Sequence, residues 1–259
     1  MKVTISLGKT LQQNASDYFG KSKKAKKKLA GLEKAVLETE KKLAGEMLKA
    51  REIKTPEKKR KKEWHEKFHW FISSDGFLVI GGRDAKSNED AVKKHMDKND
   101  LYFHAEIQGA PHTIVKSGGK KVPGQTKKEA AQFAAAFSSA WKSGSPAVDV
   151  YSVKPEQVSK SAPSGESLGT GAFMIYGERE WFRKTPIEFA IGLSEKNGEY
   201  IVISGPPSAV RKHTKNFATI KQGMLPKGAA AKRVAGVLKG GDLDELLAML
   251  PSGGIEVIK

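Results

Sequence analysis

The segment from Asp100 to Lys121, DLYFHAEIQGAPHTIVKSGGKK, concentrates residue types that could do chemistry. It holds two histidines, His104 and His112, two carboxylates, Asp100 and Glu106, and a cluster of lysines at its end. Such residues could ligate a metal ion, transfer protons or hold a negatively charged partner. Each alternative needs different companion residues, and these can be sought in the rest of the sequence.

A metal site would need ligands at a recognised spacing. Asp100, His104, His112 and His95 offer oxygen and nitrogen ligands. Their spacing matches no standard motif, such as the helical H-x-x-x-H pair. The absence of cysteine excludes disulfides, thiolate zinc sites and cysteine nucleophiles. We therefore predict that the protein uses no metal and no cofactor.

Catalysis has equally little support in the sequence. There is no G-x-S-x-G elbow and no organised Ser, His and Asp set. Asp84, Asp100 and Glu106 could act as acid or base groups, but nothing in the sequence pairs them. We therefore predict a protein that is not an enzyme.

The charge of the chain is its strongest bulk property. The 259 residues include 46 Lys and Arg against 29 Asp and Glu, which gives a net charge of +17. Such an excess repels itself and favours a polyanionic partner. Residues 21–67 alone hold 18 Lys and Arg and 8 Glu, a net charge of +10. The basic character is therefore concentrated in an N-terminal arm.

Nucleic acid is the polyanion that these residue types favour. Lysine and arginine supply phosphate affinity, while aromatic and histidine rings can stack on unpaired bases. The alternative for each lysine is an ordinary solvated side chain. The candidate nucleic-acid-binding residues are Arg83, Lys94, Tyr102, His104, His112, Lys116, Lys120, Lys121, Lys127 and Lys128.

The segment GGRDAKSNE, residues 81–89, could cradle a phosphate at the start of a helix capped by Ser87 and Asp90. The alternative is a plain turn before a capped helix. Arg83 is expected to contact phosphate or, alternatively, to pair with a carboxylate such as Asp84 or Asp100. The candidate loop-structuring residues are Gly81, Gly82, Asp84, Asn88, Asp100, Gly109 and Pro111.

The N-terminal arm has the pattern of a coiled coil. Its apolar residues follow a 3-4 spacing from residue 29 to residue 47: Leu29, Leu32, Val36, Leu43 and Met47. Pro56 favours the start of a second basic helix that carries Trp64, Phe68 and Phe71 on one face. Two antiparallel arms are therefore expected, with one solvated basic helix as the alternative.

From residue 64 onward the strand and helix signals alternate, which predicts an α+β domain. Hairpins are expected around Ser74-Asp75-Gly76 and Asn197-Gly198. Residues 100–107 alternate as a strand with one polar face, and residues 123–144 predict one helix opened by Thr126 and Glu129. The expected organisation is a basic helical arm over residues 1–63 and a nucleic-acid-binding domain over residues 64–259.

The sequence gives no sign of a membrane location. No apolar run approaches the roughly 18 residues that a transmembrane helix needs, and the first residues, MKVTISLGKTLQQ, lack the apolar core of a secretory signal. We predict a cytoplasmic protein.

Three long motifs resemble one known family. They are EWHEKFHWFISSDGFLVIGGRDAKSNEDAVKKHMDKNDLYFHAEIQGAPHTIVK, VPGQTKKEAAQFAAAFSSAWKSG and VDVYSVKPEQVSKSAPSGESL. Together they closely resemble the RNA-binding domain of the NFACT proteins, and their residues resemble those of archaeal members. The segment NASDYFGKSKKAKKKLAGLEKAV is similar to the start of that family's coiled coil. The resemblance covers nearly the whole chain.

The resemblance implies a factor of ribosome-associated quality control. It implies binding to obstructed large ribosomal subunits, to ribosomal RNA and to tRNA, with mRNA-independent tailing of the stalled nascent chain. It also implies contacts of the coiled coil with ribosomal proteins or a ligase. The family's N-terminal domain, which carries its tRNA-handling Asp-Arg residues, has no expected counterpart here. The alternatives are a protein-docking coiled-coil module and a stand-alone DNA- or RNA-binding domain.

Overall fold

The computed structural model describes residues 4–51, 62–162, 167–196 and 199–258. Contacts within the chain separate residues 1–61 from residues 62–259, close to the sequence-based division between residues 63 and 64. Each unit is described by itself. The predicted second arm falls largely on residues 52–61, which lie outside the described residues.

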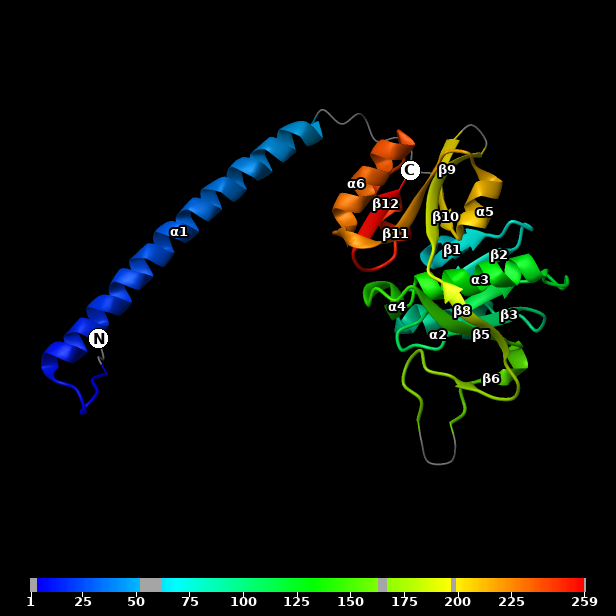
Figure 1. Ribbon diagram of the computed structural model, residues 1–259, viewed down its shortest axis with the longest axis horizontal. Helices are drawn as coiled ribbons and strands as arrows, with labels where there is room; N and C mark the ends of the chain where they lie inside the picture. Colours follow the sequence, from blue (N-terminus) through cyan, green and yellow to red (C-terminus); the bar gives the residue numbers. More distant parts are fainter. Residues whose placement is uncertain (1–3, 52–61, 163–166, 197–198, 259) are drawn as a thin grey trace. The chain divides into compact units, whose positions relative to one another are not determined.

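The N-terminal unit contains one long helix, α1 (Leu11–Arg51) (Figure 1). It begins where a capping box forms: the Thr10 hydroxyl accepts the Gln13 amide, and the Gln13 side chain accepts the Thr10 amide. The side chains of Leu29, Leu32 and Val36 are more than half exposed. The predicted apolar seam, where its side chains are described, is therefore open to solvent.

The second unit begins with a short 3-10 turn, η1 (Trp64–Lys67), and then enters a strand. Phe71 lies on that strand, β1 (His69–Ile72), so the expectation of one helical face carrying Trp64, Phe68 and Phe71 was wrong. The reason is that Trp70 and Phe71, adjacent in this strand and therefore on opposite faces of a sheet, are both buried.

The first sheet has six strands in the order β1-β2-β4-β3-β5-β8, and every neighbouring pair is antiparallel. The other strands are β2 (Leu78–Gly81), β3 (Leu101–Ala105), β4 (Thr113–Lys116), β5 (Ala147–Val153) and β8 (Glu180–Pro186). The predicted first hairpin is confirmed by the pairing of Ile72 with Leu78. Gly76 supplies the positive φ of +86° that the turn requires.

Both faces of the first sheet are covered. One carries α3 (Gly124–Ala136), whose alanine-rich surface packs closely on the strands. The helix α2 (Ala85–His95) packs on β2 and β4. Between β5 and β8 the chain forms η2 (Pro155–Gln157), β6 (Val158–Ser159) and β7 (Met174–Ile175). Because adjacent side chains on a strand face opposite ways, the burial of both Tyr102 and Phe103 shows that neither face is open.

The predicted helix over residues 123–144 is divided into α3 and α4 (Ser139–Lys142). Ser138 separates them, since its hydroxyl caps α4 by accepting the amide of Ala140. Thr126 and Glu129 do not form the predicted capping box. They bind the first hairpin instead: the Thr126 hydroxyl donates to Asp75, and the Glu129 carboxylate accepts the amide of Ser74.

The second sheet has the order β10-β9-β11-β12 and is also antiparallel. Its strands are β9 (Phe189–Lys196), β10 (Glu199–Gly205), β11 (Phe217–Leu225) and β12 (Ile255–Ile258), accompanied by α5 (Pro207–His213), α6 (Lys227–Leu238) and α7 (Leu243–Met249). The pairing of Lys196 with Glu199 confirms the second predicted hairpin. The closing strand, β12, was not predicted.

The two sheets share one hydrophobic core. Phe189 of the second sheet packs edge-on against Phe137, at the end of α3, and against Trp141 of α4. The Trp141 indole donates to the carbonyl of Gly254, 3.1 Å away, beside β12. The predicted α+β fold is therefore confirmed, and residues after 186 form an integral second layer of the unit.

Candidate nucleic-acid interface

The glycine-containing segment after β2 is closed by its own side chains. The Asp84 carboxylate caps α2 by accepting the Ser87 amide at 2.7 Å, and the Ser87 hydroxyl accepts the amides of Arg83 and Asp84. The cap is therefore Asp84, and the prediction of Ser87 as the cap was wrong. The hydrogen bonds from Ser87 hold the pKa of Asp84 below its usual value. The Asp84 carboxylate therefore accepts the hydrogen bond at the start of α2, where the sequence suggested a phosphate.

The same segment is fitted tightly to β4. A Cβ atom at Gly82 would lie 2.0 Å from Oδ1 of Asn88, and that oxygen accepts the His112 amide at 2.9 Å. A Cβ atom at Gly81 would lie 3.1 Å from the ring of Phe133. These contacts support the loop-structuring role predicted for Gly81, Gly82 and Asn88.

Arg83 is engaged by the backbone. Its Nη2 donates to the carbonyl oxygen of Phe68 at 2.9 Å and to that of Glu66 at 3.3 Å. Partial burial lowers the pKa of this guanidinium. Arg83 therefore ties α2 to the start of β1, which favours the structural alternative over phosphate contact. Its partners are carbonyl groups and not the carboxylates expected from the sequence.

Replacing Arg83 with Ala is expected to lower the free energy of unfolding by about 1–3 kcal/mol, because two hydrogen bonds to a charged donor are lost. RNA affinity of the folded protein should stay within about twofold, since the guanidinium is already engaged by two backbone carbonyl oxygens. Chemical denaturation and an RNA titration measure the two effects, with the exposed Lys86→Ala as the matched control. A large loss of RNA affinity without a loss of stability would show that Arg83 contacts RNA.

Two of the three rings predicted to stack on bases, those of Tyr102 and His112, are buried, and His104 is half-buried. Tyr102 is 1% exposed and His112 is 7% exposed. The Tyr102 hydroxyl lies 2.7 Å from Nδ1 of His112, and Phe173 packs edge-on against the His112 ring. Burial lowers the pKa of His104 to about 4 and that of His112 to about 3. The prediction of Tyr102 and His112 as base contacts was therefore wrong, and both histidines are neutral at pH 7.

These histidines should make the fold sensitive to mild acid. An unfolded histidine has a pKa of about 6.5, so the unfolded chain takes up protons first as the pH falls. Stability is full above about pH 6.5 and is lost as the pH falls toward 4. Each of the two histidines should contribute about 2 kcal/mol to the change, so urea unfolding should show roughly 4 kcal/mol less stability at pH 5 than at pH 7. His104→Gln should reduce that difference, whereas equal stability of the wild type at both pH values would contradict the assignment.

Lys116 serves the fold. Its ammonium group binds the buried carboxylate of Asp100, Oδ2 of Asp97 at 2.7 Å and the carbonyl of His95 at 2.6 Å. Asp100 also accepts the amide of Ser117 at 2.8 Å. The lysine charge is compensated and mostly buried, which argues against its predicted role in nucleic-acid binding. Asp100 fixes the chain between α2, β3 and β4, as its predicted loop-structuring role requires.

The turn between β3 and β4 is also structural. Gly109 has a positive φ of +79°, and Pro111 is buried beside it. The carbonyl of Gln108 accepts the Ser139 hydroxyl at 2.6 Å, which anchors the turn on α4. In the described part of the chain, no group of three or more His, Asp or Glu side chains is placed to hold a metal ion.

The remaining candidate lysines divide into two groups. Lys94 pairs with Asp90, and Lys127 pairs with Glu180, each at 2.7 Å. Lys120, Lys121 and Lys128 are exposed and have no ion pair among the described residues. Only this second group offers unpaired positive charge to a ligand, and it lies before and along the first half of α3.

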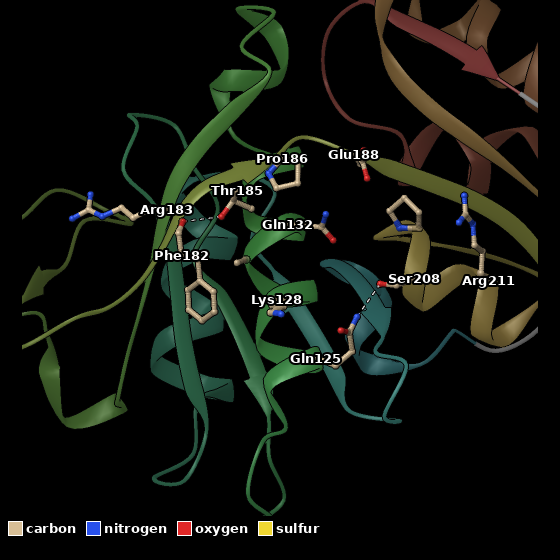
Figure 2. Close-up of a pocket in the computed structure, with 12 residues that line it drawn as sticks. Gln125, Lys128, Gln132, Phe182, Arg183, Thr185, Pro186, Glu188, Ser208 and Arg211 are labelled. Carbon is tan, nitrogen blue, oxygen red and sulfur yellow. Dashed lines mark hydrogen bonds between the residues drawn. The ribbon is translucent and has the colours of Figure 1, made fainter.

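A cleft of about 550 Å³ borders this helix, between α3, the end of β8 and α5. Figure 2 shows Lys128 on α3 and Arg211 on α5, the two helices that border it. Its lining residues are Gln125, Lys128, Ala131, Gln132, Phe182, Arg183, Thr185, Pro186, Glu188, Pro207, Ser208 and Arg211. Sequence reasoning missed the contribution of α5. The basic end of that helix, Arg211 and Lys212, was the only local signal.

Arg183 contributes little charge to the cleft. It stacks on Trp181 at 3.8 Å and donates to Asp149 at 2.7 Å, and Figure 2 shows its guanidinium pointing away from the other lining residues. The cause is a bulge in β8, where Lys184 has a positive φ of 49° and its amide donates to Asp149. The unpaired cations of the cleft are therefore Lys128 and Arg211.

The fold and the cleft define a class: a basic, antiparallel α+β unit with unpaired cations beside a concave surface. Residues 67–177 match the family described as NFACT protein RNA binding domain. The chain belongs to the NFACT family, as the motifs predicted. The match ends at Gly177, so β8 and the whole second sheet lie beyond it.

Known proteins from two domains of life are similar to this chain. The archaeal Rqc2 homolog aRqcH of Methanocaldococcus jannaschii is 43% identical over 203 residues, which cover 78% of this chain and 30% of that protein. The human ribosome quality control complex subunit NEMF is 38% identical over 173 residues, 65% of this chain and 16% of NEMF. The chain thus spans less than a third of either relative.

A solved structure is also similar to this chain. The C-terminal part of the fibronectin/fibrinogen-binding protein from Streptococcus suis is 23% identical, with a TM-score of 0.40 over 69% of this chain and 77% of that chain.

Within the described residues, no helix is both long enough and apolar enough to cross a membrane.

Proposed function

We propose that residues 62–259 bind RNA and perform no chemistry of their own. The observation that carries this proposal is the match of residues 67–177 to the NFACT RNA-binding domain. The exposed cations Lys120, Lys121, Lys128 and Arg211 support it, because unpaired positive charge is what a phosphate backbone requires. The basic helix α1 adds sequence-independent affinity along the same backbone.

The RNA is proposed to be that of a stalled ribosome. The similar human protein is named as a ribosome quality control complex subunit, and the archaeal relative as an Rqc2 homolog. By this likeness, the chain acts in the cytoplasm on obstructed large ribosomal subunits. Its RNA partners are ribosomal RNA and tRNA, and its part in nascent-chain tailing is to hold the complex together.

Docking of a protein on α1 is a second candidate function. The exposed side chains of Leu29, Leu32 and Val36 follow a coiled-coil spacing and have no cover among the described residues. A ribosomal protein or a ligase with a complementary helix would bury this seam. Such binding would be largely insensitive to salt, whereas RNA binding would weaken with salt.

A parallel titration tests the proposed function. The whole chain is titrated into labelled tRNA, a ribosomal RNA fragment and duplex DNA of equal length in one buffer. We expect both RNAs to bind more tightly than the DNA duplex, because unpaired RNA segments expose bases as well as phosphates. Absence of RNA binding, or equal affinity for the DNA duplex, would contradict the proposal.

A further inference from the structure

The cleft between α3, β8 and α5 has an apolar floor and a polar rim. Ala131, Phe182, Pro186 and Pro207 supply carbon surface. The side-chain amides of Gln125 and Gln132 lie beside it on α3. The Gln125 nitrogen already donates to Glu129 and Ser208, so its oxygen is left to accept, whereas the Gln132 amide can both donate and accept. Figure 2 shows Gln125, Gln132, Phe182 and Pro186 among the residues that line the cleft. Such a mixture suits a flat, polar-edged ligand better than a purely ionic one.

The two walls of the cleft are held at a fixed separation. The Gln125 amide donates to the Ser208 hydroxyl at 3.3 Å, and Ser208 donates to the Glu129 carboxylate at 2.7 Å. Below them, Nε2 of His213 lies 2.9 Å from the carbonyl oxygen of Ser73. These bonds join α5 of the second sheet to α3 and the first hairpin, so the cleft exists before any ligand arrives.

Positive charge faces the cleft from both walls. Lys128 stands on α3 and Arg211 on α5, and neither has an ion pair among the described residues. Glu188 is the one carboxylate of the lining, while the nearby Glu129 is buried and already accepts three hydrogen bonds. Arg211 also packs over the ring of Phe217, at 5.5 Å. The cleft therefore presents, beside an apolar surface, two cations that have no ion pair among the described residues.

We propose that this cleft binds one unpaired nucleotide of an RNA strand. The base lies on the carbon surface of Phe182 and the prolines, its edge meets Gln125 or Gln132, and Lys128 and Arg211 hold the flanking phosphates. This inference rests on the proposed RNA-binding function and gives it a place and a strand preference. Arg211 is supplied from beyond residue 177, so the site needs both sheets.

An unpaired strand fits the cleft better than the alternatives. A duplex presents phosphates and sugars over a wide surface and keeps its bases stacked inside, so it cannot fill a single hollow. A cavity of about 550 Å³ is of the size that takes one small molecule or one nucleotide. An acidic peptide would use the cations but would leave the apolar floor and the amides without partners.

The test compares two double variants of the whole chain. Lys128→Ala with Arg211→Ala removes the cleft cations. Lys232→Ala with Arg233→Ala removes the same charges from the exposed side of α6, outside the cleft lining. The probes are a fluorescent oligouridine, an RNA duplex, an oligoglutamate and inorganic polyphosphate. Circular dichroism checks folding, and Lys128→Glu is used if the double variant does not fold.

We expect the cleft variant to bind oligouridine about tenfold more weakly, and its slope of log affinity against log salt to fall by about 1.4, for two single-strand phosphates. The control variant should change the affinity less than about threefold. An unchanged cleft variant, while the wild type still binds RNA, overturns this inference alone. No RNA binding by the wild type overturns the proposed function as well. Equal affinity for the duplex, oligoglutamate or polyphosphate overturns the nucleotide assignment.

Discussion

A fourfold rise in salt is expected to weaken RNA binding by the whole chain by about 10² to 10³. Each phosphate that a lysine or arginine neutralises releases condensed counterions, and log affinity falls by about 0.7 to 0.9 per phosphate for each tenfold rise in salt. The estimate assumes about five neutralised phosphates. With a net charge of +17, the chain has ample cations to supply them.

The measurement is a fluorescence titration of labelled RNA at several salt concentrations and constant pH. Thermal melting of the protein at each salt concentration is the control for unfolding. A slope close to zero would mean that binding does not depend on phosphate contacts. That result would contradict the electrostatic account and would favour the protein-docking alternative for the basic arm.

Replacing Asp100 with Ala is expected to lower the free energy of unfolding by about 3–5 kcal/mol, the usual cost of removing one partner of a buried ion pair. The Asp100 side chain is 1% exposed and that of Lys116 is 18% exposed. Without Asp100, the lysine ammonium loses its buried carboxylate, and the amides of Asp97 and Ser117 lose their acceptor. Urea denaturation followed by circular dichroism measures the change.

Asp97→Ala is the matched control for Asp100→Ala. Asp97 binds the same ammonium group at 2.7 Å, but its side chain is 81% exposed. An exposed ion pair contributes about 1 kcal/mol or less, so this variant should stay close to the wild type. Equal losses from both variants would show that burial of the pair is not what stabilises this corner of the fold.

The fold could be predicted where the signal is local. Ser74-Asp75-Gly76 marks a turn by residue type alone, and the hairpin forms there. Helix caps are less certain, because several polar residues compete: both Asp84 and Ser87 could cap α2, and only the backbone geometry decides for Asp84. The strand β12 was missed because its four residues pair with β11, about 35 positions earlier in the chain.

The site could be predicted only in part, for a physical reason. Alternation in residues 100–107 separates Tyr102 and His104 from the apolar residues, but it cannot tell whether their face meets water. The ring of His112 packs against both side chains, and Phe173, far along the chain, packs on His112. The role of Lys116 was equally hard to predict, because the sequence does not reveal that the buried carboxylate of Asp100 lies beside it. Lys128 remained exposed, and its partner across the cleft, Arg211, is brought near by the second sheet.

The central claim is that the α+β unit, and not only the basic arm, binds RNA. The most direct test is a titration of residues 62–259, expressed without the arm, into labelled single-stranded RNA at low salt. The unit has its own hydrophobic core, so circular dichroism should show a folded protein with a cooperative melt. We expect saturable binding that is weaker than that of the whole chain. A folded unit that binds no RNA, while the isolated arm binds as tightly as the whole chain, would contradict the claim.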